Sequence, residues 1–268
     1  MSSKLFFHPG LLLMLFVAVT ACKKVIQVDL NNVTPQIVIE GEITNQSGPY
    51  LVKITKTVNF SASNVFPPVS GAIVQMTDSN NGLIVHMGET TPGVYSGNLF
   101  GGVPLHTYKL SVSAEGKQYD ATSTMPAAVL LDSVTFVQNL DFRNKDVINA
   151  VVNFQDPPGL VNYYQFTETV NNVAVPDILV FEDRLSDGKY IRNTLFNDTS
   201  RLHPDDSLVL GMYCIDKNIY NYFFSLQQVT GNNSFRSATP ANPSTNISNG
   251  ALGYFSAHTI TRRKLRVY

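Results

Sequence analysis

Apolar and polar residues alternate along much of this chain, which is the pattern of β-strands with one buried face. Residues 37–43 place three isoleucines on one face of a strand, and residues 108–114 alternate without a break. The same pattern predicts further strands at residues 51–58, 72–77, 83–87, 119–123, 133–137, 147–154, 163–170, 178–182, 208–215, 253–260 and 264–268.

Turn-forming residues separate these segments. Asn81-Gly82 is a strong hairpin signal because both residues accept a positive φ, and Glu115-Gly116 marks a second turn. Asp156-Pro157-Pro158-Gly159 and Asn171-Asn172 separate later strands. Short strands with turns at this spacing predict a β-sandwich.

The chain is therefore predicted to be mainly β, with two β-rich domains. Residues 69–125 resemble the immunoglobulin-like or transthyretin-like modules of secreted proteins, in phrases such as Gly93-Val94-Tyr95. We expect an immunoglobulin-like or transthyretin-like β-sandwich at residues 36–126. Pro126 ends strand pairing, so a second β-rich domain with one short helix is expected at residues 127–268.

One helix is predicted after Asp216, which can accept backbone N–H bonds at its start, and Gly231 can end it. The apolar residues on its predicted buried face are Ile219, Tyr222, Phe223, Leu226 and Val229. We expect this helix to pack against the second sheet. The alternative is a helix that binds a partner.

Residues 1–21 have the features of a lipoprotein signal peptide. The apolar run at residues 11–19 is too short to span a bilayer, which needs ~20 residues, and fits a secretory signal. The run ends in Val19-Thr20-Ala21-Cys22, which resembles a lipobox. We expect cleavage before Cys22, a lipid on its thiol, and a tether at residues 22–35. The alternative is an ordinary signal peptide followed by a chance cysteine.

Charge and cysteine content narrow the range of partners. The chain has 19 basic and 20 acidic residues, and the signal peptide removes one lysine, so no basic excess points to nucleic acid. Cys214 is the only cysteine besides Cys22, which leaves no internal disulfide. We expect Cys214 to be buried.

No sequence motif points to catalysis, a cofactor or a metal site. The chain lacks a Gly-x-Ser-x-Gly elbow, a His-Glu-x-x-His helix and a glycine-rich phosphate loop. Residues 78–89 have the length of a calcium-binding EF-hand loop, but Leu83 stands where that loop needs glycine, so a hairpin is predicted. The histidines His86, His106, His203 and His258 lack ligand spacing.

We therefore expect that the chain is not an enzyme. The alternative is a hydrolase that uses an acidic pair, either Glu182 with Asp183 or Asp205 with Asp206. Adjacent residues on a strand point to opposite faces, which disfavours such a pair. Asp156 and the Asp205-Asp206 pair have two interpretations, as turn-forming residues or as calcium ligands in loops.

Two short motifs suggest a modification. Asp132-Ser133-Val134 and Asp206-Ser207-Leu208 resemble the Asp-Ser/Thr-apolar motif at which Bacteroidota attach O-glycans to exported proteins. Ser133 and Ser207 are therefore candidate O-glycosylation sites, although so short a motif also occurs by chance.

Several longer motifs resemble one set of Bacteroidota lipoproteins, the domain-of-unknown-function family 4249. These are the lipobox followed by Ile26-Gln27-Val28-Asp29-Leu30, and the segments at residues 37–41, 154–159, 162–164 and 246–255. The resemblance implies a lipoprotein that accompanies a TonB-dependent outer-membrane transporter. It implies no catalytic residues. Lys23 and Lys24 stand where surface-exported lipoproteins of this phylum often carry acidic residues, so the leaflet that holds the anchor stays open.

These observations favour a lipid-anchored binding or accessory subunit of a TonB-dependent uptake system, held in the outer membrane and without a cofactor. Phe60 and Phe66 are candidate partner contacts, because large apolar side chains in a loop are unusual unless they pack or bind. Packing under the sheet is the alternative for both. A structural or adhesive surface lipoprotein is the alternative function, and a hydrolase is the third.

Overall fold

The computed structural model describes residues 34–59, 63, 65–98, 101–140, 146–197, 202–230 and 242–268. All of these except Thr34 and Asn59 belong to one compact unit, Pro35–Val58 with Ala62–Tyr268. The predicted signal peptide, Cys22 and most of the predicted tether lie outside the described residues. Within the described part of the chain, no helix combines the length and apolar character needed to cross a membrane.

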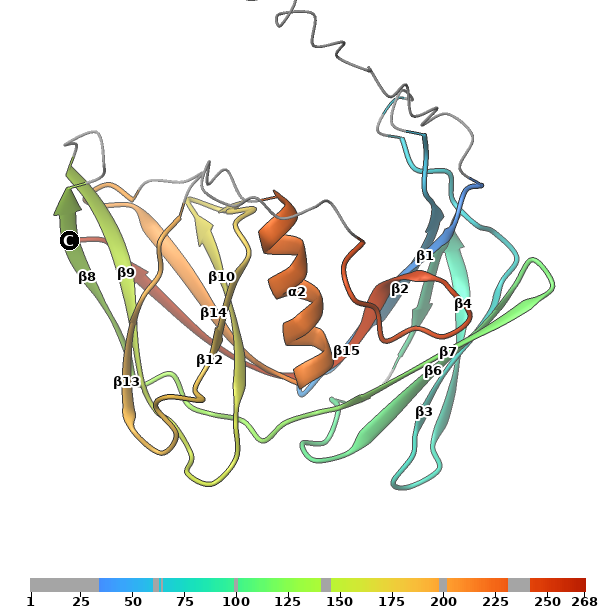
Figure 1. Ribbon diagram of the computed structural model, residues 1–268, viewed down its shortest axis with the longest axis horizontal. Helices are drawn as coiled ribbons and strands as arrows, with labels where there is room; N and C mark the ends of the chain where they lie inside the picture. The colour runs from blue at the N-terminus through green and yellow to red at the C-terminus, as the bar shows by residue number, and fades with distance from the viewer. Residues whose placement is uncertain are drawn as a thin grey trace, which may run out of the picture. The chain divides into compact units, whose positions relative to one another are not determined.

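The described chain is mainly β, and α2 (Lys217–Thr230) is its one described helix (Figure 1). The strands are β1 (Ile37–Thr44), β2 (Tyr50–Lys56), β3 (Ile73–Asp78), β4 (Ile84–Thr91), β5 (Val94–Gly97), β6 (Thr107–Ala114), β7 (Lys117–Thr124), β8 (Ser133–Leu140), β9 (Asp146–Gln155), β10 (Tyr163–Val170), β11 (Val173–Ala174), β12 (Leu179–Glu182), β13 (Tyr190–Thr194), β14 (Ser207–Ile215) and β15 (Leu252–Arg266).

These strands form two sheets. The larger has twelve strands in the order β11-β10-β14-β15-β1-β2-β5-β4-β3-β6-β7, with β12 also paired to β10. The smaller has the order β13-β9-β8. The mainly β fold with sandwiched sheets and one helix confirms the predicted fold class.

The predicted alternation is confirmed where it was strongest. In β1 the three isoleucines are buried, and in β6 every second residue from Tyr108 to Ala114 is buried. The alternation misses β5 and β13, which have four and five residues, although it finds β12, which also has four. A pattern of that length is an unreliable guide to a strand.

The two predicted turns differ in geometry. Glu115 and Gly116 have φ values of 51° and 74°, as a two-residue hairpin turn requires. Asn81-Gly82 does not form that turn, since only Gly82 has a positive φ, at 75°. Its amide instead donates to the Asp78 carbonyl at 2.9 Å, and the Asp78 amide donates to the Leu83 carbonyl, so the loop is longer than expected.

Strand β15 joins the sequence-distant parts of the large sheet. Its first half pairs in parallel with β1, from Val38 opposite Leu252 to Thr44 opposite His258. Its second half pairs antiparallel with β14, up to Ser207 opposite Arg266. The sequence had predicted two strands here, at residues 253–260 and 264–268, but they are one continuous strand (Figure 1).

Side chains complete the hydrogen bonding of β15 where a neighbouring strand is missing. The Asn246 side chain accepts from the Phe255 amide at 3.0 Å and donates to the Phe255 carbonyl at 2.8 Å, as a paired strand residue would. Ser123 Oγ accepts from the Ala257 amide, and Asn45 Oδ1 accepts from the Ile260 amide, both at 2.8 Å. These bonds satisfy buried backbone groups that would otherwise be costly.

Gly253 permits the close approach of β15 to β1. Its φ is +93°, and an added Cβ would lie 2.0 Å from the Ile39 carbonyl oxygen. Any other residue would therefore both strain the backbone and collide with β1.

The buried apolar side chains form two hydrophobic cores. The first is built from β1–β7 and includes Phe255 and Ala257 of β15, which lies against β6 and β7. The second lies between the small sheet and strands β10, β12 and β14, where the Phe154 and Tyr164 rings meet at 4.9 Å. The predicted division into domains at residues 36–126 and 127–268 stays a prediction, because β15 contributes to both cores.

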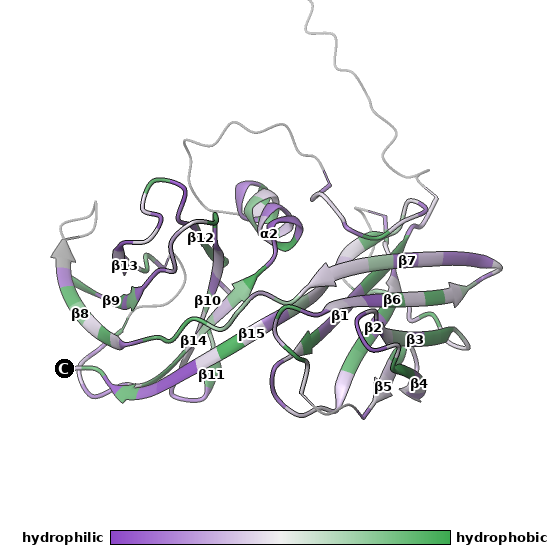
Figure 2. Ribbon diagram, turned by 90° about the horizontal axis from the view of Figure 1, so that it is seen from below, coloured by the Kyte–Doolittle hydropathy of each residue, from purple (hydrophilic) through white to green (hydrophobic). Residues whose placement is uncertain are grey.

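Helix α2 begins as predicted. Asp216 Oδ1 accepts the amides of Asn218 at 2.8 Å and Ile219 at 3.0 Å, which satisfies two N–H groups at the helix start. The helix contacts β10, β12 and β15, and only Ile219 is fully buried. Figure 2 shows hydrophilic and hydrophobic residues around its circumference. Val229, predicted on the buried face, is 47 % exposed.

Two further features concern buried polar groups. Cys214 is buried, as predicted, and burial raises the pKa of its thiol. Glu168 on β10 is also buried, and burial raises the pKa of its carboxyl to about 7. Asn197 donates to Glu168 Oε2, while Glu168 Oε1 and Asn197 Oδ1 have no partner among the described residues. Both of these unpaired atoms are hydrogen-bond acceptors when Glu168 is ionised. Protonation of the Glu168 carboxyl supplies a hydrogen-bond donor.

We predict that Glu168→Gln removes a pH-dependent part of the stability. The raised pKa means that the folded state holds the proton more tightly, so wild-type stability falls as pH rises from about 4.5 to about 7. The loss is up to about 3 kcal/mol, and the glutamine variant should lack it. Urea unfolding at pH 5 and pH 8 measures the difference. The exposed Glu115→Gln serves as control, and equal pH dependence in wild type and Glu168→Gln would contradict the prediction.

Candidate functional site

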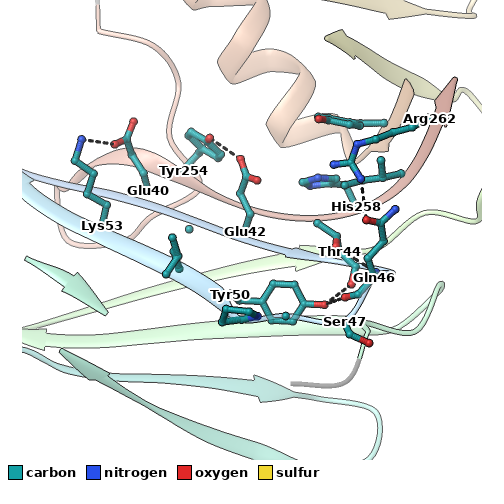
Figure 3. Close-up of a pocket in the computed structure, with 16 residues that line it drawn as sticks. Glu40, Glu42, Thr44, Gln46, Ser47, Tyr50, Lys53, Tyr254, His258 and Arg262 are labelled. Carbon is teal, nitrogen blue, oxygen red and sulfur yellow. Dashed lines mark hydrogen bonds and ion pairs between the residues drawn. The ribbon is translucent and has the colours of Figure 1, made fainter. Parts of the chain in front are cut away.

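A polar cavity lies on the face of β1, β2 and β15 that points away from the first core. Its volume is about 480 Å³. Figure 3 shows polar side chains from these three strands around the same space. We call it the β1–β15 pocket, and it is lined by Glu40, Gly41, Glu42, Thr44, Gln46, Ser47, Gly48, Pro49, Tyr50, Leu51, Lys53, Tyr213, Tyr254, His258, Ile260 and Arg262.

Strand alternation places these side chains in the pocket. In β1 the isoleucines enter the first core, so Glu40 and Glu42 lie on the opposite face. In β15, Phe255 and Ala257 enter the same core. The intervening positions therefore face the pocket side, and the parallel register sets Tyr254 beside the two glutamates.

Tyr254 links the pocket to helix α2. Its hydroxyl donates to Glu42 Oε1 at 2.9 Å, and its ring meets those of Tyr222 and Phe223 at 4.9 and 5.0 Å. Burial, together with the nearby Glu42 carboxylate, raises the pKa of Tyr254. Burial also raises the pKa of Tyr222 to about 12. Both phenols are therefore neutral hydrogen-bond donors at physiological pH.

His258 supplies a buried nitrogen atom without a partner. Its side chain is 2 % exposed, its Nδ1 lies 2.9 Å from Ser256 Oγ, and its ring stacks on Tyr213 at 5.0 Å. Its Nε2 has no hydrogen-bond partner among the described residues. Burial lowers the pKa of His258, so the imidazole is neutral near pH 7. A buried polar atom without a partner is costly.

The loop between β1 and β2 forms the other wall. The Tyr50 hydroxyl donates to the Thr44 carbonyl at 2.8 Å, which ties this loop to the end of β1. Arg262 Nη1 donates to Gln46 Oε1 at 2.7 Å, and Lys53 Nζ lies 3.9 Å from Glu40 Oε2. The pocket therefore offers exposed groups of both charges beside neutral donors and acceptors.

This arrangement suits binding better than proton-transfer catalysis. Ser256 and His258 are close enough for a serine–histidine pair, but both are only 2 % exposed. Among the described residues no carboxylate pairs with His258 Nε2 to orient the ring. A nucleophilic serine needs a base that is itself held by a third group and a position open to substrate.

Members of the acidic pairs weighed as hydrolase sites make local bonds or are buried. Glu182 accepts from Arg184 at 2.8 Å, whereas Asp183 next to it is fully buried. Asp206 accepts from the His203 amide at 2.8 Å and from the Asn171 side chain at 2.7 Å. These bonds support the turn interpretation for Asp206.

The other sequence candidates lie apart from the pocket lining. Ser133 is exposed at the start of β8, and Ser207 is half-buried at the start of β14. Phe66 is 50 % exposed, and Phe60 lies outside the described residues. Residues 242–250, which precede β15, are bound to β7, since the Ser248 amide donates to the Asp120 carbonyl at 2.8 Å.

No pocket residue except His258 was singled out from the sequence. The useful signal was the alternation in β15, where polar Tyr254, Ser256 and His258 oppose apolar Phe255 and Ala257. Alternation of polar and apolar residues identifies the polar face of a strand, but it does not identify the strand that pairs beside it. The parallel partner of β15 begins more than 200 positions earlier, as the Tyr254–Glu42 bond with its separation of 212 residues shows.

A comparison with known families gives one match. The model described as "Domain of unknown function (DUF4249)" matches residues 23–264, which is most of the chain. No curated protein matches.

We predict that Tyr254→Ala loosens helix α2. The substitution removes the ring that meets Tyr222 and Phe223 and leaves a cavity, which should lower stability by about 2–4 kcal/mol. Amides of residues 217–230 should exchange with deuterium faster than in the wild type. The control is Tyr190→Ala, whose ring is on a residue 56 % exposed. Unchanged exchange in α2 would show that Tyr254 does not hold the helix.

Proposed function

We propose a binding function for this chain, which belongs to the DUF4249 family of domains of unknown function. In this proposal it is a non-catalytic outer-membrane lipoprotein that serves as a ligand-binding or accessory subunit of a TonB-dependent uptake system. The observation that carries the proposal is the β1–β15 pocket, a cavity of about 480 Å³ lined by polar groups of both charges.

The dimensions and chemistry of the pocket support a polar guest. Ligand pockets commonly have volumes of about 300–1,000 Å³ and a few placed polar groups. Here the Tyr254 hydroxyl oxygen can accept a hydrogen bond while its proton is held by Glu42, and Lys53 and Glu42 supply opposite charges. A small polar ligand or a polar loop of a receptor would meet both kinds of charge.

Membrane anchoring would strengthen such binding. The lipobox at Cys22 predicts an acylated N-terminus, and the family match begins at the next residue. Several acyl chains hold a protein firmly, because each buried methylene contributes about 0.8 kcal/mol. Confinement to a membrane raises the effective concentration near a membrane partner, so a modest interface suffices.

The two alternative functions would require different structural features. A structural or adhesive surface lipoprotein would need neither the pocket nor a receptor. A hydrolase would need reactive groups that converge in a position open to substrate, whereas Glu182 bonds Arg184, Asp206 bonds the His203 amide, and Ser256 is buried. The binding proposal accounts for the pocket without requiring chemistry from these residues.

Lipidation is tested at the only two cysteines of the chain. Metabolic palmitate labelling should mark the wild type and the Cys214→Ala control, and Cys22→Ala should lose the label and leave the membrane fraction. Cys214 is buried and is not the predicted lipid site, so its substitution should leave the label on Cys22. Equal labelling of Cys22→Ala and wild type would refute the anchor.

The accessory role is tested by crosslinking in outer membranes followed by purification in mild detergent. A β-barrel receptor should co-purify with the wild type and with the control Glu115→Lys, which changes an exposed glutamate outside the pocket. Glu42→Lys reverses a charge in the pocket and should reduce recovery of the receptor at least tenfold, with thermal unfolding confirming that it folds. Recovery equal to the control would move the contact elsewhere. No receptor with any variant would favour the structural alternative.

A further inference from the structure

Three aspartates converge where two loops of the second core meet. Asp156 directly follows β9, Asp183 directly follows β12, and Asp187 lies in the loop before β13. One carboxylate oxygen from each lies within 4.8 Å of the other two. Asp156 and Asp183 are fully buried, and Asp187 is exposed.

Hydrogen bonds fix most of these oxygens in place. Asp156 Oδ1 accepts from the Tyr164 hydroxyl at 2.5 Å, and Asp156 Oδ2 accepts from the Gly188 amide at 2.9 Å. Asp183 Oδ1 accepts from the Asn162 amide at 2.9 Å. Hydrogen bonds from several segments of the chain therefore hold the carboxylates of Asp156 and Asp183 in one arrangement.

Asp183 Oδ2 differs from these oxygens in that no such hydrogen bond reaches it within the described part of the chain. This difference indicates that a positively charged group binds beside it. This oxygen is buried and has no hydrogen-bond partner among the described residues. None of the ion pairs found among those residues involves Asp156, Asp183 or Asp187. Buried carboxylates are normally paired, protonated or bound to a metal, because an isolated buried charge is very costly.

We propose that Asp156, Asp183 and Asp187 bind a divalent cation, with calcium as the preferred ion. The oxygen-only donor set is the one that hard cations such as Ca²⁺ select. Calcium–oxygen distances of about 2.3–2.6 Å allow two oxygens on one ion to lie up to about 5 Å apart, so three oxygens within 4.8 Å of one another can share a calcium ion. Mg²⁺ holds its oxygens closer, at about 2.1 Å, and Zn²⁺ favours nitrogen and sulfur.

The partial exposure of the cluster suits an ion that enters from solvent. Asp187 lies at the surface, where it also accepts from the Gly159 amide at 2.9 Å through Oδ1. Water and loop carbonyls would complete the coordination, since calcium takes about 6–8 oxygen ligands. The alternative is a proton shared between Asp156 and Asp183, which would satisfy the same buried oxygens without a cation.

Calcium binding is tested by calorimetry on the full lipidated protein in detergent, after removal of divalent ions with a chelator. CaCl₂ should bind at one ion per chain and raise the unfolding temperature. Terbium should bind with Tyr164-sensitised luminescence that calcium displaces, because the Tyr164 hydroxyl bonds directly to Asp156. No calcium heat and no sensitised luminescence would overturn the proposal.

Variants separate this site from unspecific acidic binding. Asp187→Asn, at an exposed position that should tolerate the change, should weaken calcium affinity at least tenfold, and Asp183→Asn should weaken it further. The matched control Asp205→Asn changes an aspartate with an 83 % exposed side chain and should bind calcium like the wild type. Equal affinity in all three variants would overturn the site. A protonated-carboxyl infrared band that Asp183→Asn removes and calcium leaves unchanged would assign the buried charge to a shared proton instead.

Discussion

The fold depends on strand β15, which pairs with strands from both parts of the chain. Its first half lies beside β1 in parallel, and its second half lies beside β14 antiparallel. A parallel pair between segments so far apart closes a long loop, which carries an entropic cost before any contact is gained. The first core includes Phe255 and Ala257 of β15, so it is complete only when this C-terminal strand has paired. The β1–β15 pocket depends on the same pairing, because its walls come from both strands.

The pocket lies where β15 changes partner. Pairing with β1 ends at His258, and pairing with β14 begins at Thr259. A strand that changes partner leaves backbone groups unpaired on each edge, and here Asn246, Ser123 and Asn45 bind them with side chains. The pocket lies beside this change of partner, and His258 is among the residues that line it. Its walls come from the paired strands and from the loop between β1 and β2.

The sequence predicted the local features well and the long-range ones poorly. Burial in β1 and β6 and the Asp216 helix cap depend on neighbours within a few residues, and all three were predicted. The pocket depends on the register between β1 and β15, which alternation does not specify. The sequence allows two interpretations of Asp156, as a turn-forming residue or as a calcium ligand. It suggests Asp183 only as the partner of Glu182 in a candidate hydrolase pair. Their shared location depends on two loops that only the folded sheets bring together.

The proposed cation would act across the two sheets that enclose the second core. Asp156 extends from β9 of the small sheet, and Asp183 extends from β12 of the large sheet. Many small domains use disulfides to hold such elements together, but Cys214 is a buried free cysteine and Cys22 is predicted to carry lipid. A divalent ion bound by both loops would replace that covalent link with one that depends on free calcium. Removing calcium should then loosen the contact between the small sheet and β12 first, while β1, β15 and the pocket keep their own hydrogen bonds.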